Sequence, residues 1–129
     1  MRKLATLIVA AFLVPSLVIP AVALGYRSGS ESERKGILRA DGAYPRLPLK
    51  CNWVVITTVK PGNWAAVQDN STRLQHDKDC RLNGMGTDFL RKSNGRWRLI
   101  VSGPSDPPYH IARMPQAVTN DLTAGLKKA

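Results

Sequence analysis

The chain has 129 residues, of which 19 are basic and 9 are acidic, so its formal net charge is +10 at pH 7. This length suits one domain and is too short for two domains that each bury a sizeable core. A positive surplus favours encounter with anionic partners, namely nucleic acid, an anionic cell-wall polymer, lipid headgroups or an acidic protein. Net charge alone also keeps a protein soluble, and this is the simpler explanation of the surplus.

The first part of the chain has the pattern of a secretory signal peptide. The basic Arg2 and Lys3 precede an apolar run at residues 4–14, and a small-x-small cleavage site follows at residues 21–23. An uncleaved membrane anchor is the alternative, because the uncharged stretch is long enough to cross a bilayer. The proline directly before the small residues favours cleavage. We therefore expect residues 1–23 to be removed from a secreted, extracytoplasmic protein, which leaves 17 basic and 9 acidic residues and a net charge of +8.

The two cysteines, Cys51 and Cys80, both lie beyond this leader. In an oxidising compartment an isolated pair most often forms a disulfide. Such a bond closes a loop of about 30 residues and stabilises a small core by roughly 3 kcal/mol in the chain-entropy model. A metal site is the alternative because His76 and His110 are present, but no Cys-x-x-Cys or His-x-x-x-His spacing accompanies them. The sequence therefore predicts a disulfide, with no metal and no other cofactor.

The first predicted element of the exported domain is a helix from about residue 31 to residue 40. Ser30 and Glu33 have the spacing of a capping box, in which each side chain binds the backbone of the other residue. Acidic residues at the start and basic residues at the end suit the helix dipole. We expect Ile37 and Leu38 to face the core. A loop rich in proline and glycine then follows.

Four strands are predicted after Cys51. Each is a run of β-branched, aromatic or alternating residues bounded by turn-forming ones. The expected strands are 53–59, 64–69, 87–92 and 96–102, with a polar loop at 70–86 between the second and the third.

The dipeptide Asn94-Gly95 is a strong signal for a two-residue hairpin turn between the last two strands. Counting outward from such a turn gives the pairs Lys92 with Trp97, Arg91 with Arg98, Leu90 with Leu99, and Phe89 with Ile100. Side chains alternate between the two faces of a strand. One face is then largely apolar and is expected to be the core; it carries Leu90, Trp97, Leu99 and Val101. The other face carries Arg91, Arg96, Arg98, Phe89 and Ile100.

The proline-rich segment at residues 103–115 should be extended and stiff. A short C-terminal helix follows it. Pro115 suits the first position of this helix, Val118 and Leu122 are spaced to pack inward, and Gly125 is placed to end it.

Together these elements predict an α+β fold with an N-terminal helix, a four-stranded antiparallel meander sheet and a short C-terminal helix. Helix is expected on one sheet face only, which gives a two-layer sandwich with one disulfide. The expected organisation is a flexible arm at residues 24–29, one small domain at residues 30–126 and a basic tail at residues 127–129.

The strand Trp64-Ala65-Ala66-Val67 and the later run from Phe89 to Ile100, which contains Gly95-Arg96-Trp97, resemble the strand pattern of small cystatin-like and NTF2-like domains. The similarity is greatest to small exported actinobacterial proteins in which a helix precedes such strands, and it covers roughly residues 31–103. The resemblance implies an α+β fold and says little about activity. No residue here matches the pocket acids or histidines of enzymes in that superfamily, and the inhibitory Gln-x-Val-x-Gly hairpin of cystatins is missing.

The candidate anion-binding residues are Arg91, Arg96 and Arg98, with Lys92 beside them. Like charges directly opposite each other destabilise a strand pair. A face that pairs Arg91 with Arg98 is tolerated more easily if it meets anions, and cations interleaved with apolar groups occur on sheets that bind nucleic acid. The alternative is a solvated face whose charges are screened by water.

Two further groups of residues are weaker candidates. Tyr109 and His110 in the proline-rich segment are candidates for contact with a partner; alternatively, Tyr109 packs on the sheet and His110 is exposed. His76, Asp77 and Asp79 have the residue types of a general base or a metal site, but they lie in a polar loop where such clusters arise by chance.

The inventory for catalysis is small. No Gly-x-Ser-x-Gly elbow and no glycine-rich phosphate loop is present in the sequence. The expected function is therefore non-enzymatic binding of an anionic partner. One alternative is a small secreted hydrolase such as a ribonuclease that uses His76 or His110 with the arginines. The other is a structural or protein-interaction module that uses residues 103–115.

Overall fold

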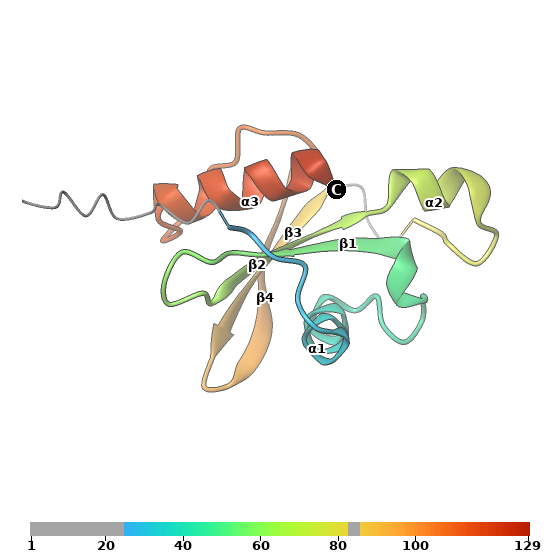
Figure 1. The fold of residues 1–129 in the computed structure, drawn as a ribbon, viewed down its shortest axis with the longest axis horizontal. Coiled ribbons are helices and arrows are strands. Elements are labelled where there is room, and N and C mark those ends of the chain that lie inside the picture. Colours follow the sequence, from blue (N-terminus) through green and yellow to red (C-terminus); the bar gives the residue numbers. More distant parts are fainter. Residues whose placement is uncertain (1–24, 83–85) are drawn as a thin grey trace, which may run out of the picture.

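The structure is a computed structural model that describes residues 25–82 and 86–129 (Figure 1). Its elements in chain order are α1 (Glu31–Asp41), the single 3₁₀ turn η1 (Leu49–Cys51), β1 (Asn52–Ile56), β2 (Trp64–Asp69), α2 (Ser71–His76), β3 (Thr87–Ser93), β4 (Arg96–Gly103) and α3 (Gln116–Lys128). Within these described residues no helix is long and apolar enough to cross a membrane. The predicted leader and its cleavage site lie outside them.

The four strands form one antiparallel sheet in the order β1-β2-β3-β4, so the predicted α+β meander is confirmed. β2 has the predicted bounds. β1 ends at Ile56, three residues before the expected end, because Thr57 and Thr58 turn away to bind a carboxylate of α3. The turn that follows brings the chain back at Trp64, whose C=O accepts a hydrogen bond of 3.0 Å from the Thr57 N–H.

Helices cover both faces of the sheet, so the expected two-layer arrangement with one covered face is corrected. Figure 1 shows the sheet between α1 and α3. The core on the α1 side comprises Ile37, Leu38, Ala43, Val54, Ile56, Ala65, Val67 and Leu90. The core on the α3 side comprises Val55, Trp64, Ala66, Phe89, Tyr109, Met114, Val118, Leu122 and Leu126. Near-continuous apolar runs such as Val54-Val55-Ile56 are typical of strands buried on both faces.

The helix α1 begins as the sequence predicts. The Glu33 N–H donates to Ser30 Oγ at 3.2 Å, and the Ser30 N–H donates to Glu33 Oε1 at 3.3 Å, which completes the capping box. Ile37 and Leu38 are buried, and Gly42 ends the helix with a φ of 95°. The Arg27 guanidinium, in the predicted arm, binds the Glu33 carboxylate at 2.6 and 2.8 Å. The Arg27 backbone also pairs with Ile56, so this part of the arm is attached to the outer edge of β1.

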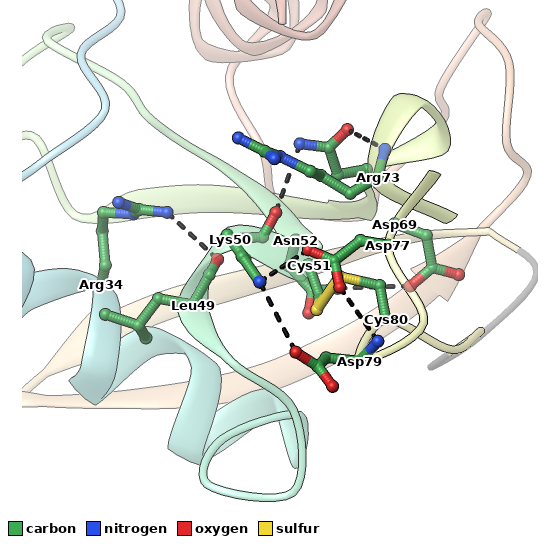
Figure 2. Close-up of a disulfide and its surroundings, with 11 residues drawn as sticks. Arg34, Leu49, Lys50, Cys51, Asn52, Asp69, Arg73, Asp77, Asp79 and Cys80 are labelled. Atoms are coloured by element: carbon green, nitrogen blue, oxygen red, sulfur yellow. Dashed lines mark hydrogen bonds and ion pairs between the residues drawn. A yellow bond between two sulfur atoms is a disulfide. The ribbon is translucent and has the colours of Figure 1, made fainter. Parts of the chain in front are cut away.

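The predicted disulfide between Cys51 and Cys80 is confirmed, with an S–S distance of 2.08 Å (Figure 2). It is consistent with an oxidising, extracytoplasmic environment. Both cysteines are buried and pack with Leu47, while Leu74 covers them from α2. The disulfide therefore joins the start of β1 to the segment that follows α2.

The expected polar loop between β2 and β3 contains the short helix α2, which is a correction. The Asn70 side chain caps it, since its Oδ1 accepts a hydrogen bond of 3.1 Å from the Arg73 N–H. Asparagine is a favoured residue at this position because its oxygen satisfies a backbone donor of the first turn. The cap and the nearby disulfide hold a helix too short to be stable alone.

The C-terminal helix continues past Gly125, where the sequence predicted its end. Its buried residues include Val118 and Leu122, as predicted, and also Gly125 itself. A Cβ atom at Gly125 would lie 2.8 Å from Cγ of Tyr26, and closer still to the side chain of Val55. Glycine is therefore present for close packing of α3 on the sheet, not for a left-handed cap. The two lysines of the predicted basic tail form the last turn of α3.

Candidate anion-binding surface

The β3–β4 hairpin carries the predicted anion-binding residues, and its turn is the predicted one. Asn94 has a φ of 52° and Gly95 a φ of 74°. Positive φ at both central residues defines the tight turn that matches the twist of two paired strands. The flanking residues Ser93 and Arg96 pair directly, so the turn has two residues.

The predicted register of this hairpin is confirmed for three pairs: Lys92 with Trp97, Arg91 with Arg98, and Leu90 with Leu99. The fourth predicted pair is wrong, because Phe89 lies opposite Val101. Ile100 is the extra residue of a β-bulge, which shifts the register by one residue beyond Leu90. Nothing in turn chemistry signals a bulge six residues away, so counting from the turn could not find it.

Three arginines lie together on one face of this hairpin, and we call Arg91, Arg96 and Arg98 the arginine surface. Arg91 is directly opposite Arg98, and Arg96 is two residues from Arg98 on the same strand. All three are exposed. They lie on the sheet face that α3 covers, but α3 packs mainly on β1 and β2. In Figure 1 the tip of the hairpin lies well away from α3.

An aromatic ring holds one of these arginines in place. The Arg91 guanidinium lies 5.4 Å from the centroid of the Trp64 ring, and the two residues are directly paired between β2 and β3. Trp64 is 4% exposed, so its position is fixed by the core. A cation–π contact of this kind contributes about 0.5–1 kcal/mol at an exposed site. The Arg91 side chain is therefore oriented before any ligand is bound.

Among the described residues, no carboxylate forms an ion pair with the arginine surface. The ion pairs between described residues join Arg27 to Glu33, Lys35 to Glu31, and Lys50 to Asp77 and Asp79. None of the three arginines has such a partner in the described part of the chain.

Comparisons with protein-family models, with curated proteins and with solved structures found no match to this chain.

The fourth predicted cation, Lys92, lies on the opposite face of the hairpin. It pairs with Trp97, and its Nζ lies 5.9 Å from the centroid of that ring. Because neighbouring side chains alternate along β3, Lys92 cannot share a face with Arg91. The structure therefore brings together three of the four predicted anion-binding residues.

The predicted core face of the hairpin is only partly correct. Leu90 is fully buried and Trp97 is half-buried, but Leu99 is 43% exposed and Val101 38% exposed. Phe89, predicted on the exposed face, is fully buried and meets the Tyr109 ring edge-on at a centroid distance of 5.1 Å. The sequence predicted only one buried face for this hairpin. In the structure α1 packs against β4 beside Trp97 on one face, and the other face is buried at Phe89 and exposed at the arginines.

Tyr109 and His110, the candidates in the proline-rich segment, have different surroundings. Tyr109 is 6% exposed. Its hydroxyl donates to the Ser105 C=O at 3.0 Å and accepts a hydrogen bond of 3.2 Å from the Gln68 amide. Thr87 completes this group, since its Oγ1 lies 3.2 Å from the same hydroxyl. Tyr109 therefore holds the proline-rich segment on the sheet, while His110 is exposed beside it.

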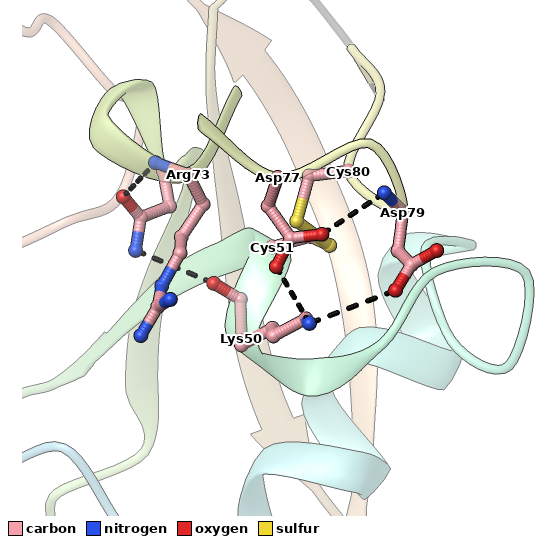
Figure 3. A network of polar contacts seen from close by, with 7 residues as sticks. Lys50, Cys51, Arg73, Asp77, Asp79 and Cys80 are labelled. Carbon is pink, nitrogen blue, oxygen red and sulfur yellow. Dashed lines mark hydrogen bonds and ion pairs between the residues drawn. A yellow bond between two sulfur atoms is a disulfide. The ribbon is translucent and has the colours of Figure 1, made fainter. Parts of the chain in front are cut away.

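The two aspartates of the His76-Asp77-x-Asp79 motif bind a lysine (Figure 3). Lys50 Nζ lies 2.6 Å from Asp77 Oδ2 and 3.8 Å from Asp79 Oδ2. This lysine lowers the pKa of the Asp77 carboxyl below its usual value, and the Asp79 N–H adds a hydrogen bond to the same carboxylate. His76 is exposed at the end of α2. In the described ranges no three potential metal ligands cluster.

Sequence reasoning missed a cavity of about 580 Å³ along the outer edge of β1. Residues far apart in the chain line it, among them Tyr26, Trp53, Arg34 and Lys128. Arg34 also donates to the Leu49 C=O at 3.2 Å (Figure 2). The cavity exists because the N-terminal arm and the end of α3 meet at one strand edge, and no local pattern predicts that meeting.

Proposed function

We propose that this protein is a non-enzymatic binding domain that holds an anionic partner on the arginine surface. One observation carries the proposal: Arg91, Arg96 and Arg98 share an exposed sheet face and have no carboxylate partner among the described residues. Guanidinium groups bind carboxylates and phosphates through paired hydrogen bonds, which makes arginine the preferred residue for such contacts.

The pairing of Arg91 with Arg98 supports this proposal energetically. Two like charges directly opposite each other destabilise a strand pair by about 0.2–1 kcal/mol. An anion between the two guanidinium groups replaces repulsion with two attractive contacts. Binding of an anion that contacts both groups would therefore reduce this repulsion.

The charge of the whole chain supports the same proposal through the rate of association. A formal net charge of +10 attracts polyanions from a distance, and this attraction falls steeply as salt rises. The net charge does not select a surface, however. Selection depends on the arginine surface, where three cations project from one face.

The experiment compares retention of the purified protein on RNA, DNA, teichoic acid, poly-glutamate and a neutral glycan at low and at physiological salt. We expect strong retention on the polyanions that falls as salt rises, and no retention on the neutral glycan. The test variant combines Arg91→Ser, Arg96→Ser and Arg98→Ser. A matched control combines Lys60→Ser, Lys78→Ser and Lys127→Ser, which removes three exposed charges elsewhere.

The arginine variant should lose retention while the lysine control keeps most of it, with unchanged circular dichroism in both proteins. Equal loss in the two variants would show that only the net charge matters. Full retention by the arginine variant would show that the anion binds at another place. Either result would end the proposal that Arg91, Arg96 and Arg98 form the site.

A further inference from the structure

The outer edge of β4 has unpaired backbone groups. The Lys92 N–H donates to the Asn63 C=O, so the backbone of Lys92 faces β2 and that of Arg91 faces β4. Arg98 lies opposite Arg91 and therefore faces β3. Backbone direction alternates along a strand, so the N–H and C=O groups of Trp97 and Leu99 face outward. They have no backbone partner among the described residues.

The side chains along the same strand are apolar and exposed. Leu99, Ile100 and Val101 are 43%, 49% and 38% exposed, and they are consecutive. An edge strand that is eight residues long, open and aliphatic is a template for pairing with another chain. Proteins usually protect such an edge with charged side chains, a proline, a β-bulge or a covering segment. In β4 the bulge at Ile100 interrupts the edge beyond Leu99 and the charges are those of Arg96 and Arg98, which repel cations and attract an acidic strand.

The opposite edge of the sheet is partly covered. The backbone of Arg27 pairs with Ile56 through hydrogen bonds of 2.7 and 2.8 Å. The Asn52 N–H donates a hydrogen bond to the Leu49 C=O of the preceding turn. Only Val54, between them, has outward backbone groups without a backbone partner in the described chain. At the edge of β4, by contrast, both Trp97 and Leu99 have outward N–H and C=O groups, and no described segment pairs with them.

We propose that the anionic partner is an extended acidic segment of another protein, which adds to β4 as a fifth strand of the sheet. This inference rests on the proposed function and specifies its partner class. The segment's backbone pairs with Trp97 and Leu99. Its carboxylates lie beside Arg96 and Arg98 on one sheet face, and its apolar side chains lie beside Trp97 and Leu99 on the other.

Charge selects this occupant over a second copy of the chain. Two copies of β4 both carry Arg96 and Arg98, and each domain has a large positive surplus, so the approach of two copies is repelled. An acidic strand is attracted instead. The observations also favour a polypeptide over a nucleic acid, because only another backbone pairs with strand-edge N–H and C=O groups and three aliphatic side chains flank the arginines.

The test uses a synthetic ten-residue peptide of alternating glutamate and valine, and a second peptide of the same sequence with N-methyl groups on alternate residues. The methyl groups remove the hydrogen-bond donors of one edge and leave the charges unchanged. We expect the first peptide to bind the purified protein at least about tenfold more tightly than the second in calorimetric titration. Hydrogen exchange at the amides of Trp97 and Leu99 should slow when the first peptide is bound.

Two variants locate the contact. Leu99→Pro removes an outward N–H, which an edge strand tolerates, and should weaken peptide binding about tenfold or more. A second variant, Leu99→Ser, keeps every backbone group and every charge, so it serves if the proline variant does not fold. This variant should also weaken binding of the unmethylated peptide. Neither change should alter retention on RNA, because both leave the arginine surface intact and RNA has no peptide backbone to pair with β4.

The possible failures can be distinguished. If the protein binds polyanions through its arginines but does not discriminate between the two peptides, the added strand is wrong and the proposed function stands. Tight binding of RNA with no binding of the first peptide would show a nucleic-acid partner and would overturn the inference in the same way. A dimer in analytical ultracentrifugation that Leu99→Pro dissociates would show that a second copy occupies the edge. Loss of all anion binding at physiological salt overturns both proposals.

Discussion

Asp121 Oδ2 accepts a hydrogen bond of 2.7 Å from Thr57 Oγ1, across 64 residues of sequence. The same oxygen accepts a second one of 3.0 Å from the Thr58 N–H, and Thr57 Oγ1 in turn accepts from the Val59 N–H at 3.1 Å. Asp121 is 8% exposed and Thr57 only 1%. A carboxylate of α3 therefore replaces the hydrogen bonds that β1 would have made if it had continued, and it fixes the helix to the end of the strand.

Replacement of Asp121 by alanine should destabilise the protein by about 1–3 kcal/mol, because it leaves a buried hydroxyl and a part-buried N–H without an acceptor. The measurement is the free energy of unfolding from denaturant titration. Asn120→Ala is the control, since Asn120 is exposed on the same helix and should change stability by less than about 0.5 kcal/mol. Equal effects of the two changes would contradict the anchoring role of Asp121.

Gly125→Ala should also destabilise the protein, although alanine is the better helix former. A glycine inside an exposed helix costs about 1 kcal/mol of stability relative to alanine. Replacement by alanine would therefore stabilise a helix that has free space around the glycine. Here the added methyl group overlaps Val55 and the ring of Tyr26, and overpacking of this kind costs about 1–3 kcal/mol. Thermal unfolding of the variant and of the unaltered protein shows whether the change in stability is negative, as expected. A stabilised Gly125→Ala protein would show that α3 does not approach β1 as closely as described.

The stability contributed by Glu33 should depend on pH in a defined range. Arg27, through its hydrogen bonds, lowers the pKa of the Glu33 carboxyl to about 2, and the Ser30 backbone assists. A carboxyl whose pKa is lower in the folded than in the unfolded state stabilises the fold above its unfolded pKa. This contribution should be complete above pH 4.5, the usual value, and should be lost as the pH falls toward 2.

Denaturant titrations of the unaltered protein and of Glu33→Gln should therefore differ most at neutral pH and converge below pH 4.5. Glutamine can still reach the Ser30 backbone, so this variant removes the charge and keeps the cap. Nuclear magnetic resonance titration gives the independent check. A Glu33 midpoint near 4.5 would mean that the contact with Arg27 is not formed in solution.

Combined replacement of Cys51 and Cys80 by serine should lower the free energy of unfolding by about 3 kcal/mol, because the closed loop restricts the unfolded chain. Intact-mass analysis of protein exported by an expressing cell checks the same bond and the predicted leader together. We expect a mass that lacks residues 1–23 and two thiol protons. A full-length N-terminus would support the membrane-anchor alternative, and free thiols would contradict the disulfide.

The parts of the fold that local chemistry determines could be predicted from the sequence. The Ser30 and Glu33 capping box, the Asn94-Gly95 turn and the four strands all depend on residues that are neighbours or near neighbours. The disulfide was predictable for a different reason, because two cysteines allow only one intramolecular bond. The turn and the alternation of side chains also suffice to place Arg91, Arg96 and Arg98 on one face.

The remaining features depend on contacts between distant segments. Whether a face of the sheet is covered depends on where α3 packs, and Phe89 gives no local sign that Tyr109 will lie against it. Gly125 has the chemistry of a helix end as well as that of a close contact, and only the position of Tyr26 decides between them. The bulge at Ile100 similarly arises from the sheet as a whole.

The two cores close at different times when the chain is made from its N-terminus. The α1 side is built from residues up to Trp97, so one face of the sheet can be covered before α3 is made. The other side waits for Val118, Leu122 and Leu126 of α3. Until then Trp64 and Phe89 face water. An interrupted or C-terminally trimmed chain would therefore keep its disulfide loop and its first helix, yet expose an apolar sheet surface of the kind that chaperones and proteases recognise.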